Sequence, residues 1–276
     1  MPALTLGLAS IVFGAGVAAG GVGALLGLGG GIFLVPLLHL IFGFPLRTAA
    51  AISLASVIAT SSAVSAARTG TQLINLRLGM VLEVATVAGG LLGGFTAHLF
   101  SERVLQRLFA GVAMLAGVAV FGRLNRRNVM LDPSADPGRL GGRFHEAESG
   151  GVVTYRIKRL PLAVVASFLA GNVSSLLGIG GGIIKVPVLN AWCGMPVRAA
   201  AATSAFMIGV TATAGAVIYY GQGQLEPALA AVAVLGVQIG SWGGMRFGGK
   251  ASVKWLKLMM AAVLLIISGL MFMRAR

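Results

Sequence analysis

The sequence contains few charged residues, one cysteine and three histidines, and each shortage excludes a class of protein. Only 10% of the 276 residues are charged, whereas soluble domains carry about 25%. Apolar stretches of about 20 residues recur along the chain instead, which is typical of membrane-spanning helices. The single cysteine, Cys193, excludes an internal disulfide. Because no cluster of Cys, His and Asp accompanies the scattered histidines, we predict no metal site and no cofactor.

Acidic residues are also scarce, with 7 Asp and Glu against 21 Lys and Arg and a net charge of +14. A charge of this size could serve nucleic-acid binding, but the basic residues lie in short loops between apolar runs. In such loops they orient spans and contact anionic lipid. We therefore expect membrane lipid as a partner and no nucleic acid. No basic stretch precedes the first apolar run, so no cleaved signal peptide is expected.

A tandem duplication is the clearest pattern that the sequence does contain. Residues 27–38 read GLGGGIFLVPLL and residues 178–189 read GIGGGIIKVPVL, with eight of twelve positions identical at an offset of 151. The likeness continues from 43–53 (GFPLRTAAAIS) to 194–204 (GMPVRAAAATS). Each copy therefore opens with a glycine cluster inside an apolar stretch.

Loop charges predict how the segments cross the membrane. The loop 122–159 carries eight basic residues and is assigned to the cytoplasm, together with the basic loop 246–257. Loop 220–226 has only Glu226 and is assigned outside. Segment 160–193 must then enter and leave from one face. A helix of its 34 residues would span about 50 Å, against a hydrocarbon core of about 30 Å, so we predict a re-entrant hairpin broken at its glycines.

The same reasoning makes segment 4–42 a hairpin that enters from the opposite face. Each repeat then holds one hairpin and three spans, and because three is odd, the two repeats are inverted. The predicted fold is an all-α polytopic membrane protein. Four full spans per repeat in parallel are the alternative, and the short second arms argue against it. The predicted parts are repeat 1 at 1–121 (hairpin 4–42, spans 48–67, 78–99 and 104–121), a flexible cytoplasmic linker at 122–159, and repeat 2 at 160–276 (hairpin 160–193, spans 199–219, 227–245 and 255–273).

The glycine clusters are the first candidates for an anion site. A helix restarts after each cluster, and the first N–H groups of a helix lack partners and carry partial positive charge. Glycine lets an anion approach such backbone closely. Tight helix packing through small residues is the alternative interpretation. The predicted substrate-binding glycines are Gly29, Gly30, Gly31, Gly180, Gly181 and Gly182.

Two charged residues lie well inside apolar segments, Lys185 and Glu83. Intramembrane charges are costly and point to function. Lys185 lies three residues after its glycine cluster and could supply the counter-charge for an anion. Pairing with Glu83 and snorkelling are the alternatives. Glu83 could carry a coupling proton, pair with Lys185 or lie near the inner interface.

Uncharged polar residues could also line the site, although hydroxyls more often bond to their own helix or a neighbour. Two prolines, Pro36 and Pro187, fall in the restarted helices and could shape them or act as gating hinges. Arg47 and Arg198 follow the repeated G-x-P-x-R and could be gating residues or interface anchors. The predicted polar lining is Asn172, Ser53, Ser204, Thr203 and Gln238.

The doubled G-x-G-G-G-x(4)-P-x-L, each copy followed by G-x-P-x-R, resembles the TauE/SafE family of sulfite and organosulfonate exporters. The likeness covers 20–121 and 165–273. It implies transport of a small sulfur-containing anion, such as sulfite or a sulfonate, across the cytoplasmic (inner) membrane of a bacterial-type cell.

We therefore predict a secondary transporter that exports such an anion by alternating access, with the anion as its substrate. A homodimer is left open. An anion channel with the same site, or an uptake permease for a related organic anion, is the alternative. An enzyme is not expected, because the chain offers only one lysine and one glutamate at depth.

Overall fold

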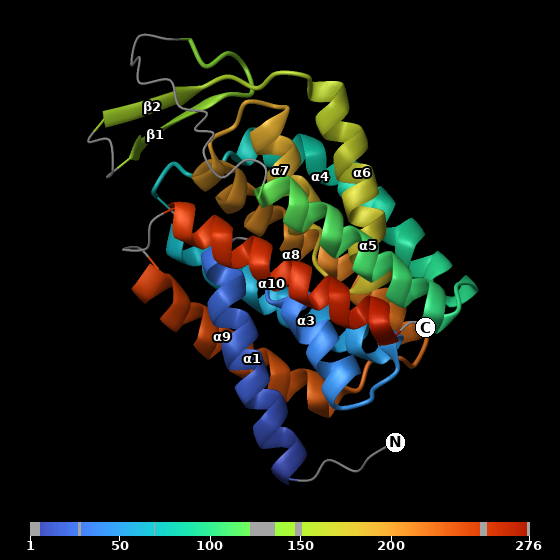
Figure 1. The fold of residues 1–276 in the computed structure, drawn as a ribbon. Helices are drawn as coiled ribbons and strands as arrows, with labels where there is room; N and C mark the ends of the chain where they lie inside the picture. Colours follow the sequence, from blue (N-terminus) through green and yellow to red (C-terminus); the bar gives the residue numbers. More distant parts are fainter. Residues whose placement is uncertain are drawn as a thin grey trace.

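The computed structural model describes residues 6–26, 29–68, 70–121, 136–146, 151–248 and 253–274. The described chain is a bundle of helices with a small β-hairpin at one end (Figure 1). A π-helix (η1, Leu37–Ile41) and a 3₁₀ turn (η2, Ala97–Leu99) extend two of the helices. The helices are α1 (Leu6–Leu26), α2 (Gly31–Pro36), α3 (Leu46–Arg68), α4 (Leu76–Thr96), α5 (Glu102–Phe121), α6 (Leu160–Leu177), α7 (Gly182–Ala191), α8 (Val197–Gly221), α9 (Pro227–Gly248) and α10 (Val253–Arg274).

Six helices in the described part are long and apolar enough to cross a membrane: α1, α3, α4 with η2, α6, α8 and α9. Many of their large apolar side chains face outward, for example Val84, Val217 and Leu235. Such a surface requires lipid rather than water around it. The protein is therefore a helical, multi-pass membrane protein, as the composition predicts.

Both broken segments pair a long first arm with a short second arm. Helix α6 ends at Leu177, where Gly178 takes a left-handed conformation with φ of 73°, which closes many helices. Gly180 and Gly181 also have positive φ before α7 begins. In the first repeat, α1 is followed by the short α2, and Gly29 has φ of 74°.

The two prolines of the short arms have different outcomes. Pro36 ends α2, and the chain continues as the π-helix η1. Proline lacks an N–H and crowds the preceding turn, which favours such a local widening. In the second repeat, α7 continues through Pro187 to Ala191 without leaving the α-helical form.

Helices of the two repeats pack crosswise. Helix α1 packs against α9, and its internal counterpart α6 packs against α4. The pairs run parallel and are closed by glycines: a Cβ on Gly240 would overlap the carbonyl of Val17, and one on Gly89 would overlap that of Phe168. These two contacts are equivalent, because Gly240 lies 151 positions after Gly89 and Phe168 lies 151 positions after Val17.

Two further pairs join each helix to its own counterpart, α3 with α8 and α5 with α10. Ser61 of α3 donates to the carbonyl of Ala205 at 2.5 Å, and Leu54 lies against Gly215. Residue numbers thus rise along α3 as they fall along α8, so counterpart helices run antiparallel. Antiparallel contacts of this kind are those expected of two repeats that are related by a two-fold axis.

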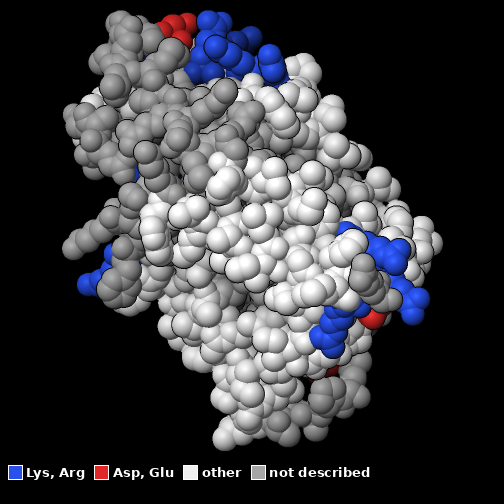
Figure 2. Space-filling view, viewed as in Figure 1, with Lys and Arg blue, Asp and Glu red and all other residues white. Residues whose placement is uncertain are grey.

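Charged groups gather at opposite ends of the bundle. At one end, the Arg47 guanidinium donates to the carbonyls of His98 and Phe100, and the Leu46 N–H donates to Glu102. At the other lie Arg68, at the end of α3, and Arg198, near the start of α8. Figure 2 shows Lys and Arg at the top, left and right edges of the visible face, with a broad uncharged band between them.

The region between the repeats holds a feature that the sequence did not predict. Its described residues include strands β1 (Gly142–Glu146) and β2 (Gly151–Tyr155), which pair antiparallel. The rest of the described fold is helical, in agreement with the predicted class, and the hairpin adds a small strand pair within 122–159. The physical reason is its apolar residues, Phe144, Val153 and Tyr155, whose side chains are buried; loop charge alone does not reveal them.

Candidate functional site at the glycine loops

The two glycine clusters lie together in the middle of the bundle. The second glycine loop, Gly178–Gly182, contacts the first at Gly31, where an added Cβ would lie 2.6 Å from the carbonyl oxygen of Gly178. Ser53 of α3 donates to that same carbonyl at 2.6 Å. The structure thus brings two predicted site residues, Ser53 and Gly31, together with Gly178 at one junction between the repeats.

Both loops also face one pair of apolar side chains. A Cβ on Gly29 would contact Val57 and Ile208, and a Cβ on Gly180 would meet the same two residues. Val57 and Ile208 are counterparts on α3 and α8, 151 residues apart. The two glycine loops therefore share one pair of counterpart neighbours at their junction.

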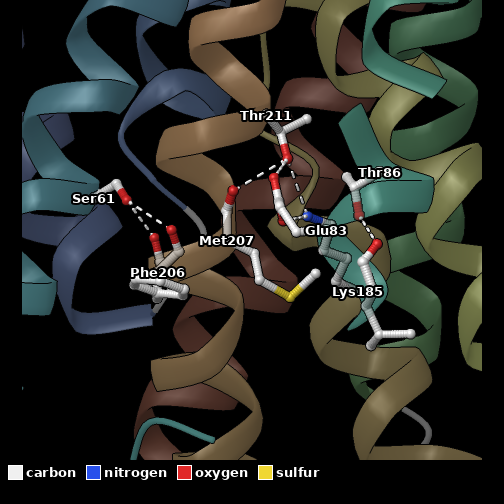
Figure 3. A network of polar contacts seen from close by, with 9 residues as sticks. Ser61, Glu83, Thr86, Lys185, Phe206, Met207 and Thr211 are labelled. Carbon is white, nitrogen blue, oxygen red and sulfur yellow. Dashed lines mark hydrogen bonds and ion pairs between the residues drawn. The ribbon is translucent and has the colours of Figure 1, made fainter. Parts of the chain in front are cut away.

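A buried ion pair joins the two repeats beside the second glycine loop (Figure 3). Lys185, on the first turn of α7, is 1% exposed, and its Nζ lies 3.8 Å from Oε2 of Glu83 on α4. Thr211 of α8 links the two groups: it donates to Oε1 of Glu83 at 2.7 Å and lies 3.4 Å from Lys185 Nζ. Three helices thus meet at one cation and one carboxylate.

The counterpart positions carry no such pair. The counterparts of Lys185, Glu83 and Thr211 are Leu34, Val234 and Thr60. Leu34 is fully buried, and Thr60 donates to the carbonyl of Ser56 on its own helix at 3.1 Å. The two sets of counterpart positions therefore differ, one holding an ion pair and the other carrying no charge.

A narrow crevice opens beside the first glycine loop. It holds about 180 Å³ of empty space but is too narrow to admit a water molecule. Figure 3 shows Ser61, one of its lining residues, on one side of α8, with the Glu83–Lys185 pair on the other side. The lining consists of Gly23, Gly29, Thr60, Ser61, Val64, Ala205 and Ile208.

Several predicted residues are engaged in structural contacts. Thr203 accepts from the Asn75 N–H at 2.9 Å, and the backbone of Asn172 packs against Gly93. Gln238 lies on the exposed face of α9, away from the glycine loops. The structure does not bring these three side chains together with the ion pair.

Three buried hydroxyls near the loops have no hydrogen-bond partner in the described part of the chain: Ser174, Ser175 and Ser204. Ser174 lies beside Gly181, at the start of α7. Ser204 is the counterpart of Ser53, and the residue matching the Gly178 carbonyl is Gly27, which lies outside the described residues. Ser174 and Ser175 therefore add donors near the second glycine loop.

The predicted arginines occupy opposite ends of the bundle. Arg47 is tied to backbone carbonyls, which suits an anchor. Arg198 lies close enough to Arg68 for the two guanidiniums to repel each other. The sequence did not predict a role for Arg68. The recurrence of a threonine at Thr60 and Thr211 is visible in the sequence, but the bridge that Thr211 makes to the ion pair is not.

No group of three metal-ligating side chains occurs among the residues that the structure describes. A model of the sulfite exporter TauE/SafE family matches residues 12–271. The chain belongs to the TauE/SafE family. This match confirms the resemblance that the doubled glycine motif indicates.

Curated relatives of this TauE/SafE protein are named as transporters. The probable membrane transporter protein YunE of Bacillus subtilis (strain 168) is 26% identical over 91% of this chain and 93% of its own. The probable membrane transporter protein MJ0441 of Methanocaldococcus jannaschii is 24% identical over 90% of each chain. No solved structure matches. A membrane transporter of the TauE/SafE family, rather than an enzyme, is what these similarities support.

Proposed function

We propose that this protein exports a small sulfur-containing anion, sulfite or an organosulfonate, across the cytoplasmic membrane. The observation that carries the proposal is the place of Lys185. Its buried ammonium lies on the first turn of α7, directly after the glycine loop that meets its counterpart from the other repeat. A fixed cation, helix N–H groups and glycines that permit close approach together suit an oxyanion.

The chemical class of the cargo follows from the family description, since the relatives' names give no cargo. Sulfite and sulfonates present three oxygens, which can accept from several donors at once. Lys185 and the buried hydroxyls of Ser174 and Ser175 supply such donors around the second glycine loop. A carboxylate presents only two oxygens and would leave more of these donors unpaired.

Alternating access between inverted repeats is the proposed mechanism. The antiparallel contacts of α3 with α8 and of α5 with α10 support inversion, because a two-fold axis that reverses helix direction lies in the membrane plane. The crevice at Ser61 and the ion pair at Lys185 lie on opposite sides of α8. Rocking of one repeat against the other would open each side in turn.

The test replaces the ion pair with the residues at the positions 151 away, Leu34 and Val234. The double variant Lys185→Leu, Glu83→Val recreates the apolar pair Leu34 and Val234 and leaves no unpaired buried charge. We expect it to fold and to lose binding of sulfite and methanesulfonate, measured by calorimetry on purified protein. Sulfate, acetate and chloride complete the panel and report the preference among anions.

A second double variant controls for disturbance of the fold. Leu34→Val with Val234→Leu alters the two counterpart positions, one in each repeat, while keeping both apolar. We expect this control to bind the anions as the wild type does. Unchanged affinity for every anion in the Lys185→Leu, Glu83→Val protein would show that the site lies elsewhere.

A further inference from the structure

The carboxylate of Glu83 occupies the one place where a substrate anion would meet Lys185. Lys185 is 1% exposed, and the hydrogen-bond acceptor that it contacts in the described part is Thr211 at 3.4 Å. The Glu83 carboxylate lies 3.8 Å from the ammonium, and its Oε2 has no hydrogen-bond partner there. The Glu83 carboxylate and the Lys185 ammonium are thus close enough to balance each other's charge, but N–H groups of the lysine remain without an acceptor among the described residues.

Other charges among the described residues do not reach this pair. Helix α6, which packs on α4, contains no ionisable residue, and α7 contains only Lys185. On α8 the ionisable residues are Arg198 near its start and Tyr219 and Tyr220 near its end. On α4 itself, Arg77 lies at the beginning of the helix. The net charge of the site therefore depends on Glu83, Lys185 and whatever the site binds.

Charge balance then restricts how an anion can enter. The empty pair is neutral. An anion at Lys185 beside an ionised Glu83 would leave one unbalanced negative charge in a buried site, which is strongly disfavoured. Protonation of the carboxylate restores neutrality and frees the ammonium to pair with the anion.

We propose that Glu83 is the binding site of a coupling proton, taken up with each anion that Lys185 binds. On loading, a proton from water joins the Glu83 carboxylate, and the anion replaces that carboxylate as the partner of Lys185. On release, the anion departs, the Glu83 carboxyl returns its proton to water and the ion pair re-forms. This inference rests on the proposed function, and it identifies the co-substrate of the same site.

A coupled proton changes what drives the transporter. One proton moving with one monovalent anion carries no net charge, so the membrane potential does not act on the cycle. The gradients of anion and proton set the direction, and export follows when the anion accumulates inside. An uncoupled anion carrier would respond to the potential instead.

Transport by the wild-type protein in proteoliposomes provides the first test. Methanesulfonate is the probe, because its charge does not change across the pH range in which carboxyl groups titrate. We expect an inward methanesulfonate gradient to acidify the lumen, read by a trapped pH dye, and a potassium diffusion potential to leave the flux unchanged. Methanesulfonate flux without acidification would overturn the proposal.

Two variants then test whether Glu83 takes up the proton. Lys185→Arg keeps a permanent positive charge at position 185, because a guanidinium stays protonated. The variants K185R and K185R/E83Q therefore differ in only one titratable group, the carboxyl at position 83. Calorimetry of methanesulfonate binding in buffers of different ionisation enthalpy counts the protons. We expect one proton per anion for K185R and none for K185R/E83Q, with the affinity of K185R falling about tenfold per pH unit once Glu83 ionises.

Equal proton uptake by K185R and K185R/E83Q would show that Glu83 does not bind the coupling proton. If K185R does not fold, the lumen acidification of the wild type is compared with that of Glu83→Gln instead. Acidification that persists in E83Q would count against the proposal. A wild-type protein that neither binds nor moves sulfite or methanesulfonate would contradict the proposed function itself.

Discussion

Thr211 and Thr60 are counterparts in the two repeats, and each hydroxyl lies 3.1 Å from a carbonyl of its own helix, Met207 for Thr211 and Ser56 for Thr60. Thr211 has a second, closer acceptor, the buried carboxylate of Glu83 at 2.7 Å, which Thr60 does not share. Both side chains are buried. The difference in partner lets the two positions serve as a matched pair for measuring the ion pair.

We expect Thr211→Val to lower the free energy of unfolding by about 1.5–3 kcal/mol, because a bond to a charged group is lost. Thr60→Val should cost about 0.6 kcal/mol, the average for side-chain hydrogen bonds within membranes. Unfolding in mixed detergent micelles, followed by circular dichroism, measures both. Equal losses in the two variants would mean that Thr211 does not support the charge pair.

For single residues, the sequence predicts which charged side chains are buried better than it predicts which uncharged polar side chains lie near them. Lys185 and Glu83 stand out because charge is rare in apolar segments, and the structure brings them together, one of the alternatives considered. Gln238 and Thr203 are equally polar, yet one is exposed and the other accepts from the backbone of Asn75. Which way a polar residue faces depends on helix rotation, and these helices have apolar residues on every side, so periodicity does not reveal it.

Among the elements, the glycine faces of α1 and α9 control how closely two helices approach. Gly240 lies against the carbonyl of Val17, whereas Gly243, one turn further along α9, has no atom within 4 Å of where its Cβ would be. Backbone contact of this kind gives membrane helices close packing without polar groups.

We expect Gly240→Ala to destabilise the protein by about 1–3 kcal/mol, because the helices must separate to admit a methyl group. Gly243→Ala is the control and should be neutral or stabilising by about 0.5–1 kcal/mol, since alanine favours helix more than glycine does. Thermal melting in detergent compares the two. A Gly240→Ala protein as stable as the control would show that α1 and α9 do not touch there.

The sequence predicts where these elements break but not which ones pair. The recurrence of Gly89 at Gly240 and of Gly93 at Gly244 marks the duplication, and tight packing was one reading of such small residues. Their partner helices come from the opposite repeat, however. The local sequence does not predict which distant helix a glycine face packs against. The β-hairpin was missed because five-residue strands lie in a region read only for its charge.

For the molecule as a whole, sidedness remains a prediction. Thr71 and Gln222 are counterparts in exposed loops, each following a long helix of its repeat. Inverted repeats place them on opposite sides of the membrane, and parallel repeats place them on the same side. The pair therefore separates the two topologies with one kind of label.

In a protein whose buried Cys193 is replaced by alanine, we expect Thr71→Cys to react with a membrane-impermeant maleimide only after cells are opened. Gln222→Cys should react in intact cells, because loop 220–226 is predicted to lie outside. The shift in gel mobility after labelling measures the reaction of each cysteine. Reaction of both variants in intact cells, or of neither, would favour parallel repeats.

The single ion pair has a further consequence for energetics. In a cycle where the two repeats exchange shapes, identical repeats would give inward-open and outward-open forms that are related by a two-fold rotation and equal in free energy. The counterparts of the charged Lys185 and Glu83 are the apolar Leu34 and Val234, so exchange of shapes would not reproduce the same contacts. In such a cycle the divergence of the two copies at these positions would make the two forms unequal in free energy and favour one open side at rest.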